Sequence, residues 1–377
     1  MAGLYIHIPF CGSKCIYCDF YSLPNNHYLI DPYIDALLIE GKSRANELLS
    51  ESIKTVYLGG GTPSLLNKGQ ISKLVIGLKE IFDFSNVEEF TIEVNPDDIT
   101  AEYIEHLKKL GINRVSMGVQ SFRDEDLRFI NRRHTSAQAI NAVELIKAAG
   151  IDNISIDLIY GIPGQNIINW ESNINIATSL GIHHISAYSL MYEHGTRLTV
   201  MRSLGKVKEM CEDEVAQMFE YLVKTLKNKG FSHYEISNFA LPGFASKHNS
   251  SYWDLTPYLG LGVAAHSFNG KDRIYNPSNL KLYIDSVNHG KSFAVVEQIS
   301  DDEKFDEFIM LRLRTSEGVS SIDVKNRFAD KYYDYFMKKV AVLVRRGMII
   351  QKMDKFYIPE KHVLISDNIT CELLWEE

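Results

Sequence analysis

Short runs of β-branched and aromatic residues alternate with helical patterns along the first two hundred residues. In the helical patterns, apolar residues recur on one face, as Ile71, Leu74, Val75 and Leu78 do. Alternation of this kind predicts a parallel sheet whose strands are joined by helical crossovers. The six expected strands lie at 4–8, 55–59, 89–94, 113–119, 153–160 and 183–190.

A local signature repeats where a helix is expected to end and a strand to begin: KKLGINRVSM, KAAGIDNISI, TSLGIHHISA and KNKGFSHYEI. Its glycines, Gly111, Gly150, Gly181 and Gly230, suit the left-handed position that ends a helix. Six consecutive units predict an α/β fold, a partial (β/α)6 TIM-like barrel. A doubly wound open sheet is the competing geometry, and both place a ligand site at the carboxyl ends of the strands. A helix near 32–50 is expected to have Asp31 as N-cap and Pro32 at its first position.

The regularity weakens after about residue 205 and changes again near residue 300. From there the chain shows three helical patterns, DDEKFDEFIMLRLR, VSSIDVKNRF and YYDYFMKKVAVLVRRG, followed by the hairpin-like MIIQKMDKFYIP. We therefore expect a barrel over 1–205, a barrel extension over 206–300, and a smaller helical or winged-helix-like domain over 301–377. The last unit is either a structural cap or a partner-binding module.

Composition narrows the class of protein. The chain has 377 residues, of which 45% are apolar, and no apolar run approaches the roughly 20 residues needed to span a bilayer. The start, MAGLYIHIPF, lacks the basic flank and long apolar core of a signal peptide, so we expect a cytoplasmic protein. A net charge of −8 argues against nucleic-acid binding, which depends on basic surface. Transient membrane association stays open.

Three of the five cysteines, Cys11, Cys15 and Cys18, form a C-x3-C-x2-C motif directly after the first expected strand. Structural zinc sites usually have four N or S ligands, and no partner motif lies downstream. Three thiolates from one loop therefore indicate an iron–sulfur cluster with one iron free of protein ligands. A zinc site or a redox thiol loop is the alternative. Cys211 and Cys371 stand alone and are expected to be ordinary small side chains.

In its motif and the position of that motif, the chain resembles the radical SAM superfamily. The segment Tyr5-Ile6-His7-Ile8-Pro9-Phe10-Cys11, with Tyr17-Cys18, narrows the resemblance to the group that contains the oxygen-independent coproporphyrinogen III oxidases (HemN) and the HemW heme chaperones. The likeness covers nearly the whole chain. It implies a [4Fe–4S] cluster on the three cysteines, S-adenosylmethionine (SAM) bound at the open iron, and an electron donor for the cluster.

Polar residues at the other strand ends are candidates for SAM binding. Side-chain-free residues in the segment 59–63, GGGTP, let the backbone approach a ligand. Glu93 and Asp157 would bring carboxylates to a cationic ligand, Gln120 offers both donor and acceptor, and Arg132 can pair with a carboxylate. A surface ion pair for Arg132 and a turn acceptor for Asp157 are the alternatives. The positions that match SAM contacts in the resemblance are Tyr5, Tyr17, Gly60, Gly61, Thr62, Glu93, Gln120, Arg132 and Asp157.

Two features separate the members of the group. The oxidases of the group that this chain resembles have a further cysteine two positions after the third cluster ligand. This chain has Phe20 at that position. The segment 247–253, KHNSSYW, fits the H-N-x-x-Y-W motif of the HemW proteins. Imidazole is a common axial ligand of heme iron, so His248 is a heme-ligand hypothesis. The alternative is that Tyr252 and Trp253 are core aromatics and His248 caps a turn.

The resemblance thus implies a chaperone that binds the cluster, SAM and heme and transfers heme to an accepting protein, expected to be respiratory. It is favoured over an enzyme of another class, an oxidase that decarboxylates coproporphyrinogen III by a radical mechanism. The third interpretation is an iron–sulfur redox or regulatory protein without a porphyrin ligand.

Overall fold

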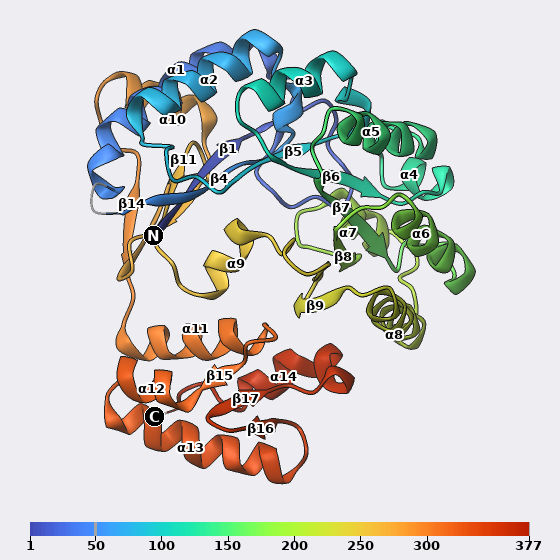
Figure 1. The fold of residues 1–377 in the computed structure, drawn as a ribbon, viewed down its shortest axis with the longest axis vertical. Coiled ribbons are helices and arrows are strands. Elements are labelled where there is room, and N and C mark those ends of the chain that lie inside the picture. Colours follow the sequence, from blue (N-terminus) through green and yellow to red (C-terminus); the bar gives the residue numbers. More distant parts are fainter. Residues whose placement is uncertain (49–50, 377) are drawn as a thin grey trace.

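The computed structural model describes residues 1–48 and 51–376, and a twelve-stranded curved sheet forms its centre (Figure 1). Six parallel strands lie side by side in chain order, which confirms the predicted barrel-like array: β1 (Ala2–Ile8), β4 (Ile53–Gly60), β5 (Glu89–Val94), β6 (Arg114–Gln120), β7 (Asn153–Tyr160) and β8 (His184–Ser189). A doubly wound sheet would reverse its strand order at a switch point, and this one does not.

Helices cover the outer face of these strands, since each crossover buries one apolar stripe against the sheet (Figure 1). They are α1 (Ile30–Arg44), α2 (Lys68–Ile81), α3 (Ala101–Lys109), α5 (Ser136–Ala148), α6 (Ile167–Ser179) and α8 (Glu212–Asn228). The short helices α4 (Asp124–Phe129) and α7 (Arg197–Ser203) do not contribute to that core, and Leu198 of α7 packs in a separate cluster with Ile16 of the cysteine loop. Asn67, Thr135 and Asn166 begin α2, α5 and α6 with capping boxes. The predicted helix-ending glycines, Gly111, Gly150, Gly181 and Gly230, all have positive φ.

The predicted start of the first helix is wrong. The 3-10 turn η1 (His27–Leu29) runs directly into α1, so Leu29 occupies the N-cap and no side chain caps the helix. Asp31 therefore lies inside the first turn. The helix ends at Arg44, and a 3-10 turn η2 (Ala45–Leu48) follows it. The rest of the predicted span, residues 49–50, lies outside the described residues.

The stretch between the barrel strands and the C-terminal helices adds strands to both edges of the sheet. On one edge β11 (Tyr258–Leu261) pairs parallel with β1, and β12 (His266–Phe268), β13 (Asp272–Tyr275) and β14 (Val295–Gln298) follow antiparallel. On the other edge, β10 (Asn238–Ala240) and β9 (Ser232–Glu235) extend the sheet beyond β8. Helices α9 (Lys247–Trp253) and α10 (Leu280–Asn288) belong to this stretch, while β2 (Phe10–Cys11) and β3 (Leu23–Pro24) frame the cysteine loop.

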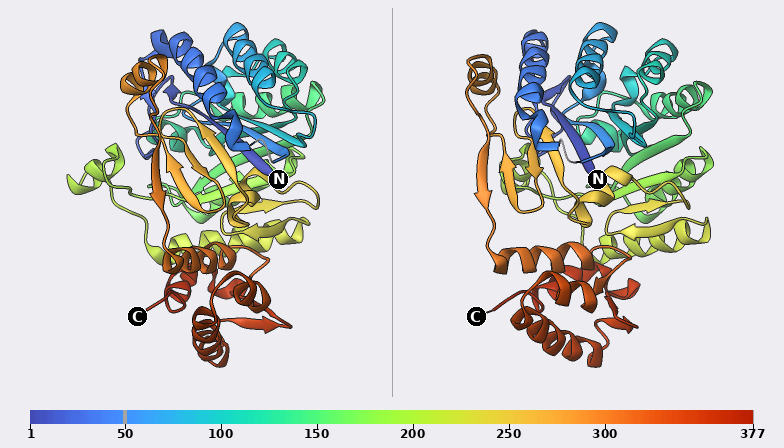
Figure 2. Two further views of the ribbon diagram at one scale, coloured as in Figure 1. Left: turned by 90° about the vertical axis from the view of Figure 1, so that its left-hand side faces the viewer. Right: turned by 60° about the vertical axis from the view of Figure 1, so that its left-hand side comes forward.

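The C-terminal part has a hydrophobic core of its own, with buried residues from Phe305 to Leu373, and lies beside the barrel (Figure 2). Its helices are α11 (Asp301–Leu313), α12 (Ser321–Arg327), α13 (Asp330–Arg345) and α14 (Ser366–Cys371), and its small sheet comprises β15 (Val319–Ser320), β17 (Lys355–Tyr357) and β16 (Ile350–Lys352). Three helices followed by a hairpin match the predicted helical, winged-helix-like unit. Among the described residues, no helix combines the length and apolar character needed to cross a membrane.

A buried carboxylate fastens the β11–β13 extension to the barrel. Glu40 of α1 accepts hydrogen bonds from the Tyr283 hydroxyl (2.6 Å), Asn276 Nδ2 (2.7 Å) and the Gly262 amide (2.8 Å). It also pairs with Arg44, whose other carboxylate partner is Glu47. Among the described residues, the Tyr283 hydroxyl and the Gly262 amide donate to Glu40 alone, whereas Asn276 and Arg44 have further partners. Loss of Glu40 would leave the first two groups buried without an acceptor.

Replacing Glu40 with alanine is therefore expected to lower the free energy of unfolding by about 3–5 kcal/mol, as for other buried pairs that lose one partner. Glu47→Ala is the matched control, because Glu47 binds the same arginine from an exposed position and should cost less than about 1 kcal/mol. Urea unfolding followed by circular dichroism measures both values. Equal effects of the two substitutions would contradict the role given to Glu40.

Candidate functional site

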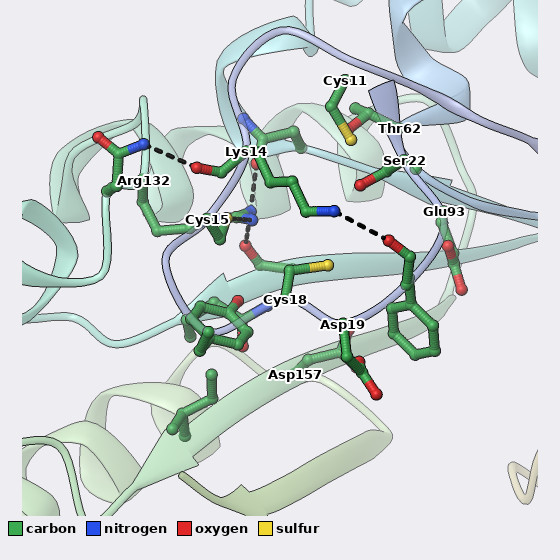
Figure 3. Close-up of a pocket in the computed structure, with 18 of the residues that line it drawn as sticks. Cys11, Lys14, Cys15, Cys18, Asp19, Ser22, Thr62, Glu93, Arg132 and Asp157 are labelled. Carbon is green, nitrogen blue, oxygen red and sulfur yellow. Dashed lines mark hydrogen bonds between the residues drawn. The ribbon is translucent and has the colours of Figure 1, made fainter. Parts of the chain in front are cut away.

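The carboxyl ends of the barrel strands enclose a cavity of about 380 Å³, at the end of the sheet where a parallel barrel binds its ligands (Figure 3). The structure brings eleven of the thirteen predicted site residues to its walls. They are Cys11, Cys15, Cys18, Tyr17, Gly60, Gly61, Thr62, Glu93, Gln120, Arg132 and Asp157.

The cysteine loop forms one wall of this cavity. All three of its thiols are free, and two are contacted from other segments. The hydroxyl of Thr62, after β4, lies 3.5 Å from Cys11 Sγ, and Nη1 of Arg132, between α4 and α5, lies 3.4 Å from Cys15 Sγ. Among residues 1–48 and 51–376, no three metal-binding side chains converge as they would on a single ion. A [4Fe–4S] cluster makes a different demand, because each thiolate binds its own iron at a separate corner.

The glycine-rich segment packs directly on the cysteine loop. The Gly61 amide donates to Ile8 O (2.7 Å) and the Thr62 amide to Phe10 O (2.8 Å). A β-carbon on Gly61 would lie 2.6 Å from Phe10 O, so only glycine permits this approach. Since the Gly60 amide also donates, to Glu93 Oε2 (3.0 Å), the amides of this segment are already used within the protein. These three amides are therefore not available to a ligand.

Two carboxyl groups face the same cavity. Burial raises the pKa of Glu93 to about 7, with the nearby Asp157 adding repulsion, although the Tyr57 hydroxyl donates to Glu93 Oε1 at 2.8 Å. Burial likewise raises the pKa of Asp157 to about 6, although hydrogen bonding from Ser186 partly opposes the shift. Two desolvated acids in one cavity are a poor arrangement for stability alone, and a bound cation would restore the charged form of both.

Arg132 and Gln120 complete the polar wall. Arg132 Nη2 donates to Gly118 O (2.6 Å) and to Asn95 Oδ1, whereas its Nε is buried and without a hydrogen-bond partner among the described residues. Among residues 1–48 and 51–376, Arg132 forms no ion pair with a carboxylate, at the surface or below it. Gln120 has a φ of 67° next to a register shift in β6, a strained conformation for a residue with a side chain. Such strain is typical of residues held in place for a ligand.

The sequence reasoning missed three contributors. Asn95 accepts a hydrogen bond from Arg132, and Tyr57 donates one to Glu93. The buried Ser22 hydroxyl lines the cavity and has no hydrogen-bond partner in the described part of the chain. Asn95 lies two positions after Glu93 at the same strand end, so its place along the strand was a usable signal. Nothing local to Ser22 indicated that the loop after the cysteines returns to the cavity. Unpaired polar atoms on Ser22 and Arg132 are consistent with a polar group bound between them.

Two predicted residues lie elsewhere. The Tyr5 hydroxyl is hydrogen-bonded to His7 Nδ1 (3.0 Å), and its ring borders a neighbouring cavity rather than the one with the cysteines. His248 is buried, with Nδ1 bonded to Thr55 Oγ1 (2.8 Å) and Nε2 bonded to the Tyr252 hydroxyl (2.8 Å). Burial lowers the pKa of His248 to about 3, so it is neutral. Iron ligation by His248 would require one of these two bonds to break.

Comparison with known proteins identifies the family to which the chain belongs. The model of the radical SAM superfamily matches residues 5–176. A protein named heme chaperone HemW from Bacillus subtilis is 35% identical over 382 residues, covering the whole of both chains. Its namesake from Lactococcus lactis is 34% identical over 373 residues, covering 99% of this chain and 97% of its own.

The structural comparison extends over the same length. The crystal structure of coproporphyrinogen III oxidase (HemN) from Escherichia coli, described as a radical SAM enzyme, superposes with a TM-score of 0.85 at 25% identity. The match covers 99% of this chain and 90% of the oxidase. The chain therefore belongs to the radical SAM superfamily and, within it, to the HemW family.

Proposed function

We propose that this protein is a heme chaperone that holds a [4Fe–4S] cluster on Cys11, Cys15 and Cys18, binds SAM beside it, and delivers heme to an accepting protein. The observation that carries the proposal is the full-length likeness to proteins named heme chaperone HemW, in a chain whose three motif cysteines line one cavity. A cluster on three cysteines, with Cys211 and Cys371 as free thiols, suits a reducing compartment, and we assign the protein to the cytoplasm on that ground.

The residues of the cavity have separable roles toward SAM. The carbonyl oxygens of the glycine-rich segment and the Glu93 carboxylate would bind the amino group, and Arg132 would face the carboxylate. Asp157 would place a negative charge near the sulfonium, and Gln120 would hydrogen-bond the ribose. When bound, the reduced cluster supplies one electron that can cleave a C–S bond of SAM, and an external donor must reduce it.

Phe20 argues against the second candidate, the oxidase. Its side chain is 64% exposed at the mouth of the cavity, and it can neither ligate iron nor act as a thiol. The oxidases of the group that this chain resembles have cysteine at this position. The fold alone does not separate the two functions, since the E. coli oxidase shares it. We therefore favour transfer of heme, with a respiratory protein as the recipient, over decarboxylation of coproporphyrinogen III.

A first prediction tests the cluster. After anaerobic reconstitution the wild-type chain should hold about four irons, and alanine at Cys11, Cys15 or Cys18 should abolish this content because each thiolate binds one iron. Cys211→Ala and Cys371→Ala are the matched controls, since both thiols are exposed and stand apart from the cavity. Iron and sulfide analysis measures the result. Stoichiometric zinc in the wild type, or loss of iron in Cys211→Ala, would contradict the assignment.

A second prediction concerns SAM and pH. Glu93→Gln and Asp157→Asn should each weaken SAM binding about tenfold, a loss of about 1.4 kcal/mol, without changing the iron content. Because only the charged carboxylates attract a cation, wild-type affinity should fall as the pH drops through about 7 and then about 6, the pKa values of Glu93 and Asp157. In the double variant the fall over this range should be shallower. Equilibrium dialysis measures both, and an unchanged affinity would assign the two acids a structural role.

The same pKa values predict that the stability of the ligand-free protein falls as the pH rises, whereas the SAM affinity rises. A carboxyl whose pKa is raised in the folded state stabilises the fold below its unfolded pKa and loses that contribution as the pH rises through the folded value. Ligand-free protein should therefore become less stable between about pH 4 and pH 7. Urea unfolding at several pH values should show a flatter dependence in the Glu93→Gln, Asp157→Asn double variant.

A further prediction separates chaperone from oxidase. With SAM, a reductant and an intact cluster, the protein should not convert coproporphyrinogen III, while it should bind heme. Anaerobic incubation followed by chromatography of the porphyrins tests the first part, and titration with hemin tests the second. The E. coli oxidase is the positive control for the assay. Turnover by the wild-type chain would overturn the chaperone proposal.

A further inference from the structure

A second and larger cavity, of about 940 Å³, lies next to the one with the cysteines. One wall is the β11–β13 extension, and the opposite wall is α11, the first helix of the C-terminal part. Tyr5 and His7 of β1 also border it. The cavity is therefore formed where the two parts of the chain meet, a common place for ligand sites.

Aromatic and apolar side chains dominate this cavity. The rings come from Phe20, Tyr21, Tyr252, Tyr258, Phe268 and Tyr275, and Leu255, Met310 and Leu311 add aliphatic surface. Arg273 is the one basic residue of the lining, and it pairs with Glu297 and Glu307. Walls of this kind suit a large, flat, apolar ligand with a polar edge.

His266 is the one histidine of this cavity with free ring nitrogens. It is exposed at the start of β12, its ring stacks on Tyr275 with centroids 5.6 Å apart, and no described residue is hydrogen-bonded to either nitrogen. The other, His7, is buried and uses Nδ1 for Tyr5 and Nε2 for Tyr21 O (3.0 Å). Burial and the nearby Arg273 lower the pKa of His266, which keeps the imidazole neutral and able to bind a metal.

The H-N-x-x-Y-W motif contributes to the same cavity through Tyr252. The rings of Tyr252 and Tyr258 pack edge-to-face with their centroids 4.6 Å apart, and both rings line the cavity wall. His248 lies behind Tyr252 and is hydrogen-bonded to its hydroxyl. In this arrangement His248 is a positioning residue, which orients an aromatic wall without facing the cavity itself.

The cysteine loop connects the two cavities. Asp19 and Phe20, directly after Cys18, line both of them. A change in the cluster loop would therefore move a wall of the larger cavity as well. This shared wall gives a physical route from the cluster and SAM to a ligand in the neighbouring cavity.

We propose that the larger cavity is the heme site, with His266 as the axial ligand of the iron and the aromatic wall around Tyr252 stacked on the porphyrin. The inference rests on the proposed function, since it names the place where the transported heme is held. It differs from the hypothesis that His248 is the ligand, and it keeps heme apart from the SAM cavity.

Hemin titration of the anaerobically prepared, cluster-containing protein tests the inference, with heme bands read from difference spectra. His266→Ala should shift these bands and weaken heme binding by about tenfold or more. His289→Ala is the matched control, because His289 is exposed on α10 and lies outside this cavity. His248→Ala should leave the band positions unchanged, and any loss of affinity should be smaller.

Met310→Glu provides a second variant that does not remove a ligand. Met310 is 36% exposed, so the new carboxylate should be tolerated in the free protein. A bound apolar macrocycle would remove that carboxylate from water, and the cost of desolvation should weaken heme binding. Lower affinity in this variant together with shifted bands in His266→Ala supports the inference. Unchanged bands in His266→Ala, or a shift found in His248→Ala instead, would overturn the ligand assignment. A wild-type chain that binds no hemin would instead overturn the proposed function itself.

Discussion

The parallel pairing of β1 with β4 is the constraint on which the rest of the site depends. The register sets His7 beside Gly59 and Ile8 beside Gly60, and the pairing continues past the strand ends as the Gly61 and Thr62 amides donate to Ile8 and Phe10. Cys11 follows at once. The loop with the cysteines is thereby tied to the loop with the glycines, so the metal-binding and ligand-binding segments form one wall.

The cavity behind the cysteine loop contains two buried carboxyl groups, which favour the binding of a cation. Glu93 and Asp157 are held where both have raised pKa values, and the protein uses hydrogen bonds from Tyr57 and the Gly60 amide to keep Glu93 oriented. Burying two acids together lowers the stability of the free protein, and a positively charged ligand reverses that effect. The strained backbone of Gln120 also lowers the stability of the free protein, since the fold holds the residue at a positive φ that its side chain disfavours.

At the opposite end of the barrel, the amino ends of the strands are closed by a network of buried hydrogen bonds. There Glu89 accepts from the backbone amides of Lys247 and His248 (both 2.9 Å), and His248 in turn is bonded to Thr55 and Tyr252. Arg114 lies fully buried with Glu89. These contacts secure α9 beneath the strands. The segment 247–253 therefore joins the base of the barrel to the aromatic cavity, and His248 would act on a ligand there only through Tyr252.

The sequence by itself determined the features that depend on neighbours along the chain. The six strands, the helix-ending glycines, the cysteine loop and the strand-end positions of Glu93, Gln120 and Asp157 follow from periodicity and local motifs, and the structure places these three side chains around one cavity. The order of the strands did not follow from the sequence, because the same periodicity fits a doubly wound sheet, whose strand order reverses at a switch point. The structure decided for the barrel order.

Only the tertiary structure decided which residues meet across long separations. His248 and Thr55 are 193 positions apart, and no local pattern indicated that their hydrogen bond would remove the histidine from solvent. The same holds for Tyr5, which matches a SAM contact in the resemblance and borders the other cavity, and for His266, which no sequence motif marks as a cavity residue. Burial and ligand access depend on how the β11–β13 extension and α11 pack against the barrel, and packing of that range leaves no periodic signal in the sequence.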